Sequence, residues 1–186
     1  MAKYRKISYS EYSVKGGDLV VIGKYGDNNY ALNISFECAK RGANMAIFNL
    51  RESLKQELSE RLEAETLSGE LYIDDTTSPT IDQIIDKCNQ IRIKSIIIDF
   101  PCQISYTKAE LRELKQLCES LDIIEIIVMD ISKTGTKPKA SDFNNKALKD
   151  IADVICIITD TKEILLKNKY GKVGIFTNDE SELVNI

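Results

Sequence analysis

Gly17-Asp18-Leu19-Val20-Val21-Ile22 begins the stretch that decides the fold of this chain. A glycine turn runs into four consecutive apolar residues, which is typical of a short buried strand. The connection Gly23-Lys24-Tyr25-Gly26-Asp27-Asn28-Asn29 follows, and a helical pattern starts near Tyr30-Ala31-Leu32-Asn33-Ile34. A buried strand, a glycine-containing connection and a helix in this order predict the first unit of a parallel sheet covered by helices.

The same alternation of short apolar runs and amphipathic stretches continues along the chain. It predicts an α/β fold with a mostly parallel twisted sheet and helices on both faces. The expected strands cover residues 19–22, 45–50, 71–73, 95–99, 123–129, 154–159, 163–168 and 173–177, and the last two should form an antiparallel hairpin. The expected helices cover residues 28–41, 53–67, 80–91, 108–120 and 143–150, with Gly42 as a C-terminal stop and with Ser53 and Thr80 as N-caps.

Length and composition favour a single folded domain. The chain has 186 residues, and its apolar content of 43% is ordinary for a soluble globular protein. A net charge of −4 argues against bulk neutralisation of nucleic acid. The charge is uneven, because residues 52–86 hold ten acids and two bases, whereas residues 133–149 hold five lysines and one aspartate. The lysine-rich stretch is either a surface for phosphate or an acidic partner, or a solvated loop and helix.

The cysteines and the N-terminus give expectations about metal and compartment. The chain has no histidine, and its five cysteines form no C-x-x-C pair, which argues against a zinc site. Cys38, Cys88 and Cys118 fall in helical patterns and Cys156 in a strand pattern, and they are interpreted as small buried residues of a reducing compartment, while Cys102 is the fifth cysteine. No signal-peptide core and no run of about 18 apolar residues is present, so we expect a cytoplasmic protein without membrane contact.

Several stretches, taken together and in order, resemble the C-terminal motor domain of replicative DNA helicases of the DnaB family. Beside the opening segment they are residues 45–50 (Met-Ala-Ile-Phe-Asn-Leu), 71–76 with 80–84, 95–100 (Ser-Ile-Ile-Ile-Asp-Phe), 151–155 and 167–171 (Lys-Asn-Lys-Tyr-Gly). The resemblance implies a RecA-like fold of the P-loop NTPase type. The expected organisation is an N-terminal extension over residues 1–14, the RecA-like domain over residues 15–178 and an acidic tail over residues 179–186.

Aligned with that family, the phosphate-binding loop is degenerate. The family loop ends in Gly-Lys-Ser/Thr, whose backbone N–H groups and lysine hold the phosphates. Here Gly26 takes the place of the glycine, Asp27 that of the lysine and Asn28 that of the magnesium-binding hydroxyl, while Gly23 and Lys24 stand earlier in the loop. An aspartate repels a triphosphate, and Lys24 lies on the wrong side of the loop to replace the missing lysine.

Other positions of the family's site have also changed. Arg51 stands where the family has its catalytic glutamate and is interpreted, with Glu52, as a surface residue of a first helical turn. Asp130 stands where a sensor glutamine is expected. Asp99 matches the magnesium-positioning aspartate and is a weak metal candidate, or else a loop-capping residue. Lys167 and Lys169 match a basic pair that acts on a neighbouring subunit, where the second is normally an arginine finger, or else belong to a solvated hairpin turn.

These changes predict a pseudo-ATPase that acts as an interaction or accessory protein, in DNA replication or in a mobile element. No catalytic residue and no cofactor are expected, with ATP and Mg²⁺ only if the degenerate site still functions. A protein partner or self-association is expected. The alternatives are an active DNA helicase-type ATPase, a nucleic-acid-binding accessory protein that uses Lys133, Lys137 and Lys139, and another doubly wound protein with a site at Asp27, Asp99 and Asp130.

Overall fold

The computed structural model describes residues 14–25, 29–100, 106–131, 142, 146–159, 162–170 and 174–177. Several predicted features lie outside these residues. They are the loop positions Gly26, Asp27 and Asn28, the lysines Lys133, Lys137 and Lys139, Cys102, the extension up to residue 13 and the acidic tail from residue 179.

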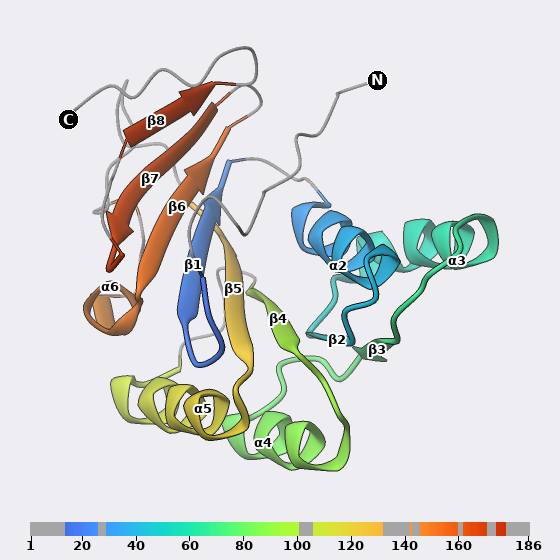
Figure 1. The fold of residues 1–186 in the computed structure, drawn as a ribbon, viewed down its shortest axis with the longest axis horizontal. Coiled ribbons are helices and arrows are strands. Elements are labelled where there is room, and N and C mark those ends of the chain that lie inside the picture. Colours follow the sequence, from blue (N-terminus) through green and yellow to red (C-terminus); the bar gives the residue numbers. More distant parts are fainter. Residues whose placement is uncertain are drawn as a thin grey trace.

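The described residues form an eight-stranded sheet, as the apolar runs predicted. Its strand order is β3-β2-β4-β5-β1-β6-β7-β8 (Figure 1). The strands are β1 (Leu19–Lys24), β2 (Met45–Phe48), β3 (Leu71–Asp74), β4 (Ser95–Phe100), β5 (Ile124–Asp130), β6 (Val154–Ile158), β7 (Lys162–Asn168) and β8 (Gly174–Thr177). The first six in spatial order run parallel, and β7 and β8 are antiparallel additions, so the predicted C-terminal hairpin is confirmed.

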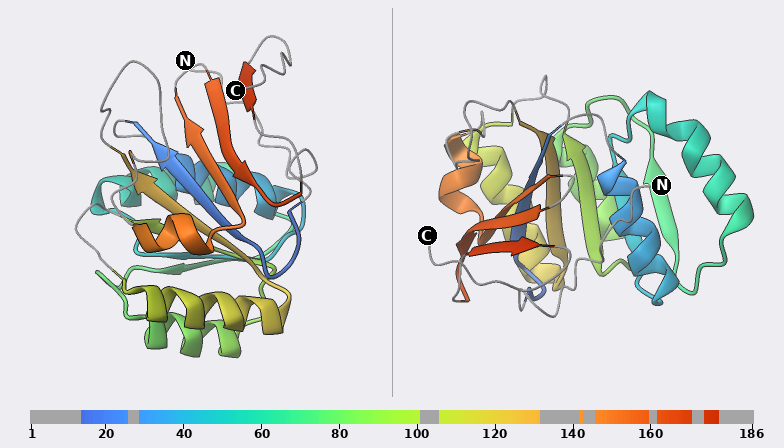
Figure 2. Two further views of the ribbon diagram at one scale, coloured as in Figure 1. Left: turned by 90° about the vertical axis from the view of Figure 1, so that its left-hand side faces the viewer. Right: turned by 90° about the horizontal axis from the view of Figure 1, so that it is seen from above.

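Helices cover both faces of the sheet (Figures 1 and 2). They are α2 (Tyr30–Lys40), α3 (Lys55–Ala64) after a 3₁₀ turn at Glu52–Leu54, α4 (Ile81–Gln90), α5 (Lys108–Leu121) and α6 (Lys146–Ile151). The alternation of β1 divides the core between the two faces. Leu19 and Val21 pack in the cluster that holds α4, α5 and α6, whereas Val20 and Ile22 pack in the cluster that holds α2. Burial on both faces explains why this strand reads as an uninterrupted apolar run.

Of the three residues predicted to begin or end helices, two do so in the structure and one does not. Thr80 and Gln83 form the capping box that begins α4, and Gly42 adopts a φ of 87° just after α2. Ser53 is not an N-cap, because the chain already turns at Arg51 and places Ser53 inside the 3₁₀ turn. Leu62, an apolar residue of α3, is 45% exposed.

One carboxyl group is buried near the start of β5. Glu125 is fully buried, and neither of its carboxylate oxygens has a hydrogen-bond partner among the residues that the structure describes. Burial raises the pKa of Glu125 to about 8, against the opposing charge of Lys115. The buried thiols Cys88 and Cys118 lie within electrostatic reach of this carboxyl, and burial raises their pKa values as well. Glu125 is therefore protonated in the folded protein at neutral pH.

We predict that this carboxyl makes the protein less stable as the pH rises. Below about pH 4.5 both states hold the proton, whereas above it only the folded state does until the pH approaches 8. The contribution to the unfolding free energy therefore falls by roughly 1.4 kcal/mol per pH unit across this window. Urea unfolding at pH 5, 6.5 and 8 should show Glu125→Gln gaining on the wild type with rising pH. Glu113→Gln, at an exposed position of α5, serves as the control, and parallel profiles for Glu125→Gln and wild type would contradict the prediction.

Candidate functional site

Four charged side chains meet where the central parallel strands end. Lys24 is the last residue of β1, Asp130 is the last residue of β5, and Asp99 is the penultimate residue of β4. Arg51 follows β2 by three residues. Since parallel strands place their carboxyl ends at one edge of the sheet, residues far apart in the sequence become neighbours there, at the edge where open α/β sheets bind their ligands. We call these four residues the strand-end cluster.

Arg51 is the centre of the strand-end cluster. Its Nε lies 3.1 Å from Asp99 Oδ2, and its Nη2 lies 3.3 Å from Asp99 Oδ1. The same Nη2 lies 2.8 Å from Asp130 Oδ2. Lys24 Nζ lies 3.2 Å from the other oxygen of Asp130. The planar guanidinium thus holds one carboxylate with two nitrogens and joins it to a second, an arrangement that lysine does not provide.

The backbone next to Arg51 is fixed by an asparagine. Asn49 has a φ of 59°, a left-handed conformation that asparagine adopts more readily than most residues. Its side chain donates a hydrogen bond of 2.7 Å to the carbonyl of Asp99 and accepts one of 3.0 Å from the N–H of Ser78. These bonds tie the end of β2 to the end of β4. The chain therefore leaves β2 in the direction that carries Arg51 over the strand ends.

The strand-end cluster is buried and has no net charge. Asp99 and Lys24 are each 1% exposed, Arg51 is 15% exposed and Asp130 is 28% exposed. Burial raises the pKa of Asp99, and the positive charges of Arg51 and Lys24 offset part of that effect. Two cations and two anions balance one another, which suits a set of charges with little access to water.

The structure revises the interpretation of one residue and leaves another as expected. Arg51 is not a surface residue, because two aspartates at the ends of neighbouring strands hold it. Glu52 does point to solvent, with a side chain that is 85% exposed. Gly23 lies within β1 and pairs with both β5 and β6, so neither it nor Lys24 belongs to the loop after the strand. The strand-end rule places Arg51, Asp99 and Asp130 at the same end of the sheet, and the strand order β2-β4-β5 makes them neighbours.

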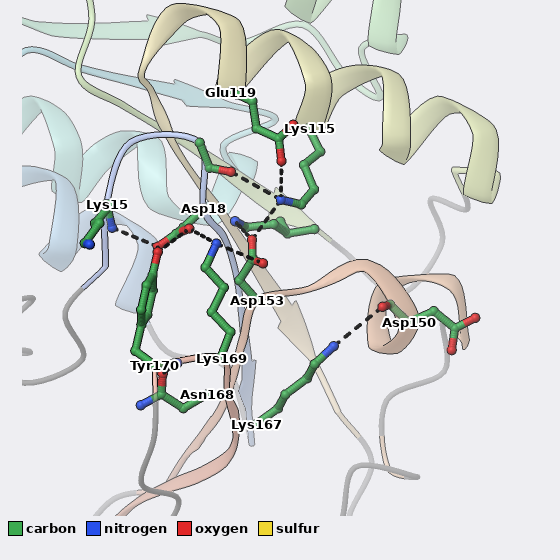
Figure 3. A network of polar contacts seen from close by, with 12 residues as sticks. Lys15, Asp18, Lys115, Glu119, Asp150, Asp153, Lys167, Asn168, Lys169 and Tyr170 are labelled. Carbon is green, nitrogen blue, oxygen red and sulfur yellow. Dashed lines mark hydrogen bonds and ion pairs between the residues drawn. The ribbon is translucent and has the colours of Figure 1, made fainter.

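The two lysines matched to the finger positions lie at the opposite end of the sheet, where the parallel strands begin (Figure 3). Lys167 donates to the carbonyls of Lys149 and Asp150 near the end of α6, at 3.1 and 3.5 Å. Lys169 forms ion pairs with Asp18 and Asp153, which precede β1 and β6. Both lysines are thus held by their own chain, and neither is near the strand-end cluster.

Asp18 and Asp153 are the centre of a second polar network, at the end of the sheet where β1 and β6 begin (Figure 3). The Tyr170 hydroxyl donates to Asp18 at 2.8 and 2.9 Å, and the Lys15 N–H donates to the same carboxylate at 2.8 Å. Asp153 accepts from the Leu19 N–H and from Lys115, each at 2.9 Å. Although burial opposes it, these donors and Lys169 lower the pKa of Asp153. The network fastens the hairpin turn after β7 to the start of β1.

Comparison with known proteins identifies the fold. No protein-family model matches the chain, and no curated protein matches it. Among solved structures it is similar to that of a DnaB-like replicative helicase studied with its interactions with primase, with a TM-score of 0.68 and 16% sequence identity. The match covers 88% of this chain and 56% of that protein, so the chain spans just over half of its length. The chain has a RecA-like α/β fold, as the resemblance implied. No helix among the described residues is long and apolar enough to cross a membrane.

We predict that the strand-end cluster depends on Arg51 for stability. Arg51→Met removes the partner of a carboxylate that stays buried, which typically costs about 3 to 5 kcal/mol. Urea unfolding should show this loss, and adding Asp99→Asn to the same chain should recover part of it. Arg41→Met, at an exposed arginine after α2, is the control and should change stability by less than about 0.5 kcal/mol. A cost for Arg51→Met as small as that of the control would show that the ion pairs are not structural.

Proposed function

We propose that this chain is a DnaB-helicase-like RecA domain without ATPase chemistry, which acts as an interaction or accessory protein. The observation that supports it is the position of Arg51, whose guanidinium lies against Asp99. In the resembling family this aspartate positions magnesium. A cation brought to the same carboxylate would meet a positive charge already bound there.

The lysine at the end of β1 is also held in an ion pair and is therefore not available to a phosphate. Lys24 is the described lysine at the end of β1, and it is buried in an ion pair with Asp130. To reach a phosphate, the buried Lys24 would have to leave the partly exposed carboxylate of Asp130. Breaking buried ion pairs of this kind costs several kcal/mol, which a nucleotide would have to supply from its own contacts. Asp27 and Asn28 also disfavour nucleotide binding, because they stand where the family has the lysine that binds phosphate and the hydroxyl that binds magnesium.

The contacts of Lys167 and Lys169 support the same proposal. A finger that acts on a neighbouring subunit must be free to reach the neighbour's phosphate. Lys169 is held between two carboxylates, and burial of Asp18 to 1% exposure strengthens that attraction. We therefore propose that the pair fixes the hairpin of its own chain. The DnaB-like replicative helicase of similar fold was studied with its interactions with primase, which suggests partners among proteins of DNA replication.

We predict that nucleotide does not stabilise the protein. Melting curves are recorded with and without millimolar MgATP and MgADP. A ligand present at 100 times its dissociation constant stabilises by about 2.7 kcal/mol, a shift of roughly 5 to 10 °C for a chain of this size. The expected result is no shift with either nucleotide. A clear shift that Asp99→Asn abolishes would overturn the proposal and favour the active-ATPase alternative.

The nucleic-acid alternative has a separate test. Anisotropy of a labelled single-stranded oligonucleotide is followed as protein is added at low and at moderate salt. Binding that weakens steeply with salt and is lost on replacing Lys133, Lys137 and Lys139 with glutamine would favour a nucleic-acid-binding accessory protein. We expect no such binding, because the chain as a whole is acidic.

A further inference from the structure

The carboxyl of Glu125, which lacks a hydrogen-bond partner among the residues that the structure describes, lies in apolar surroundings. Glu125 pairs with Leu19 of β1 and with Ile96 of β4, so its neighbours in the sheet offer it no polar group. Its side chain points to the same face of β5 as Ile127, the face whose core includes residues of α4 and α5. A carboxyl in such a place either keeps its proton or needs a cation when it ionises.

The ionisable groups that interact with Glu125 come from α4, from α5 and from the residue before β6: they are Cys88, Cys118, Lys115 and Asp153. Burial raises the pKa of Cys88 to about 12 and raises the pKa of Cys118 as well. Although burial opposes it, hydrogen bonds to Glu119 and Asp153 raise the pKa of Lys115, and the donors around Asp153 lower its pKa. Between about pH 7 and 9 the charge of Glu125 therefore changes, while the charges of these four groups stay fixed.

Lys115 is the cation of this group, and in the structure it binds oxygens nearer the surface (Figure 3). Its Nζ lies 2.9 Å from Asp153 Oδ2, 2.8 Å from Glu119 Oε1 and 3.3 Å from the carbonyl oxygen of Gly17. The Lys115 side chain is 16% exposed, whereas Glu125 is fully buried. The ammonium therefore stands between the solvent-facing carboxylates and the buried carboxyl.

The spacing of the strands brings both carboxyls within reach of Lys115. Glu125 pairs with Leu19, whose N–H donates to Asp153, so the three residues stand side by side where β5, β1 and β6 begin. Neighbouring strands are about 4.8 Å apart, which places the backbone at Glu125 and at Asp153 roughly 10 Å apart. Lysine carries its charge on a flexible stem, so rotation of the stem moves the ammonium by several ångströms. We propose that Lys115 is a proton-controlled switch, which binds Asp153 while Glu125 is protonated and moves to Glu125 when that carboxyl ionises.

The switch changes the part of the sheet to which α5 is fastened. While Glu125 holds its proton, Lys115 joins α5 to Gly17 before β1 and to Asp153 before β6. Once the proton has left, the same ammonium joins α5 to β5. Glu119, which is 54% exposed, then loses its cation, so the surface at this end of the molecule becomes more negative. The switch lies at the opposite end of the sheet from the strand-end cluster and does not depend on the function proposed above.

Double-mutant cycles on the full chain test this exchange of partners. The cycle of Lys115→Met with Asp153→Asn is measured by urea unfolding at pH 6.5 and at pH 9. At pH 6.5 the coupling should change the unfolding equilibrium constant by at least about fivefold, and at pH 9 it should fall to about twofold or less. The cycle of Lys108→Met with Asp150→Asn is the control, because this ion pair of 2.6 Å also involves α5 but is exposed, and its coupling should not change. A coupling between Lys115 and Asp153 that is the same at both pH values overturns the inference.

A spectroscopic titration tests the switch without the double variants, in case one of them does not fold. Carboxyl ¹³C NMR of protein labelled in its aspartate and glutamate side chains follows Asp153 and Glu125 together. In the wild type the Asp153 signal should move with the midpoint of Glu125, near pH 8, although Asp153 itself stays ionised. In Glu125→Gln and in Lys115→Met the Asp153 signal should stay in place over this range. An Asp153 signal that does not follow Glu125 in the wild type, or that still follows it in Lys115→Met, overturns the inference.

Discussion

The ion pairs of Arg51 are the interaction on which the carboxyl-terminal ends of the central strands depend. Four parallel strands end here with their charged residues turned inward, and the edge is stable only because the charges balance. The chain balances these charges with its own side chains, since Lys24 and Arg51 pair with Asp130 and Asp99.

The opposite end of the sheet, where the parallel strands begin, is also stabilised by ion pairs, between different residues. Asp18 and Asp153 stand before neighbouring strands, and Lys115, Lys169 and Tyr170 surround them. This second network joins α5, the start of β1 and the turn after β7, which are distant in sequence. The sheet is thus fastened at both ends by internal ion pairs.

Much of the fold was readable from the sequence, because strands buried on both faces appear as apolar runs and helix starts appear as capping boxes. The start of α4 at Thr80 is an example. The position of Arg51 was not readable in the same way. Its partners lie 48 and 79 residues away, and their proximity depends on the order of the strands in the sheet. Local patterns carry no information on that order, so the residue looked like part of an ordinary first turn.

The strand-end cluster and the acidic stretch over residues 52–86 differ in the electrostatic field that they exert on their surroundings. Charges that neutralise one another inside the strand-end cluster exert little field on the surroundings, because opposite charges a few ångströms apart cancel at longer range. Acids outnumber bases by eight over residues 52–86, although some of these acids form ion pairs, such as Glu52 with Lys55 and Glu65 with Arg61. This excess of acids leaves a negative potential on that part of the chain, whereas the charges of the strand-end cluster sum to zero.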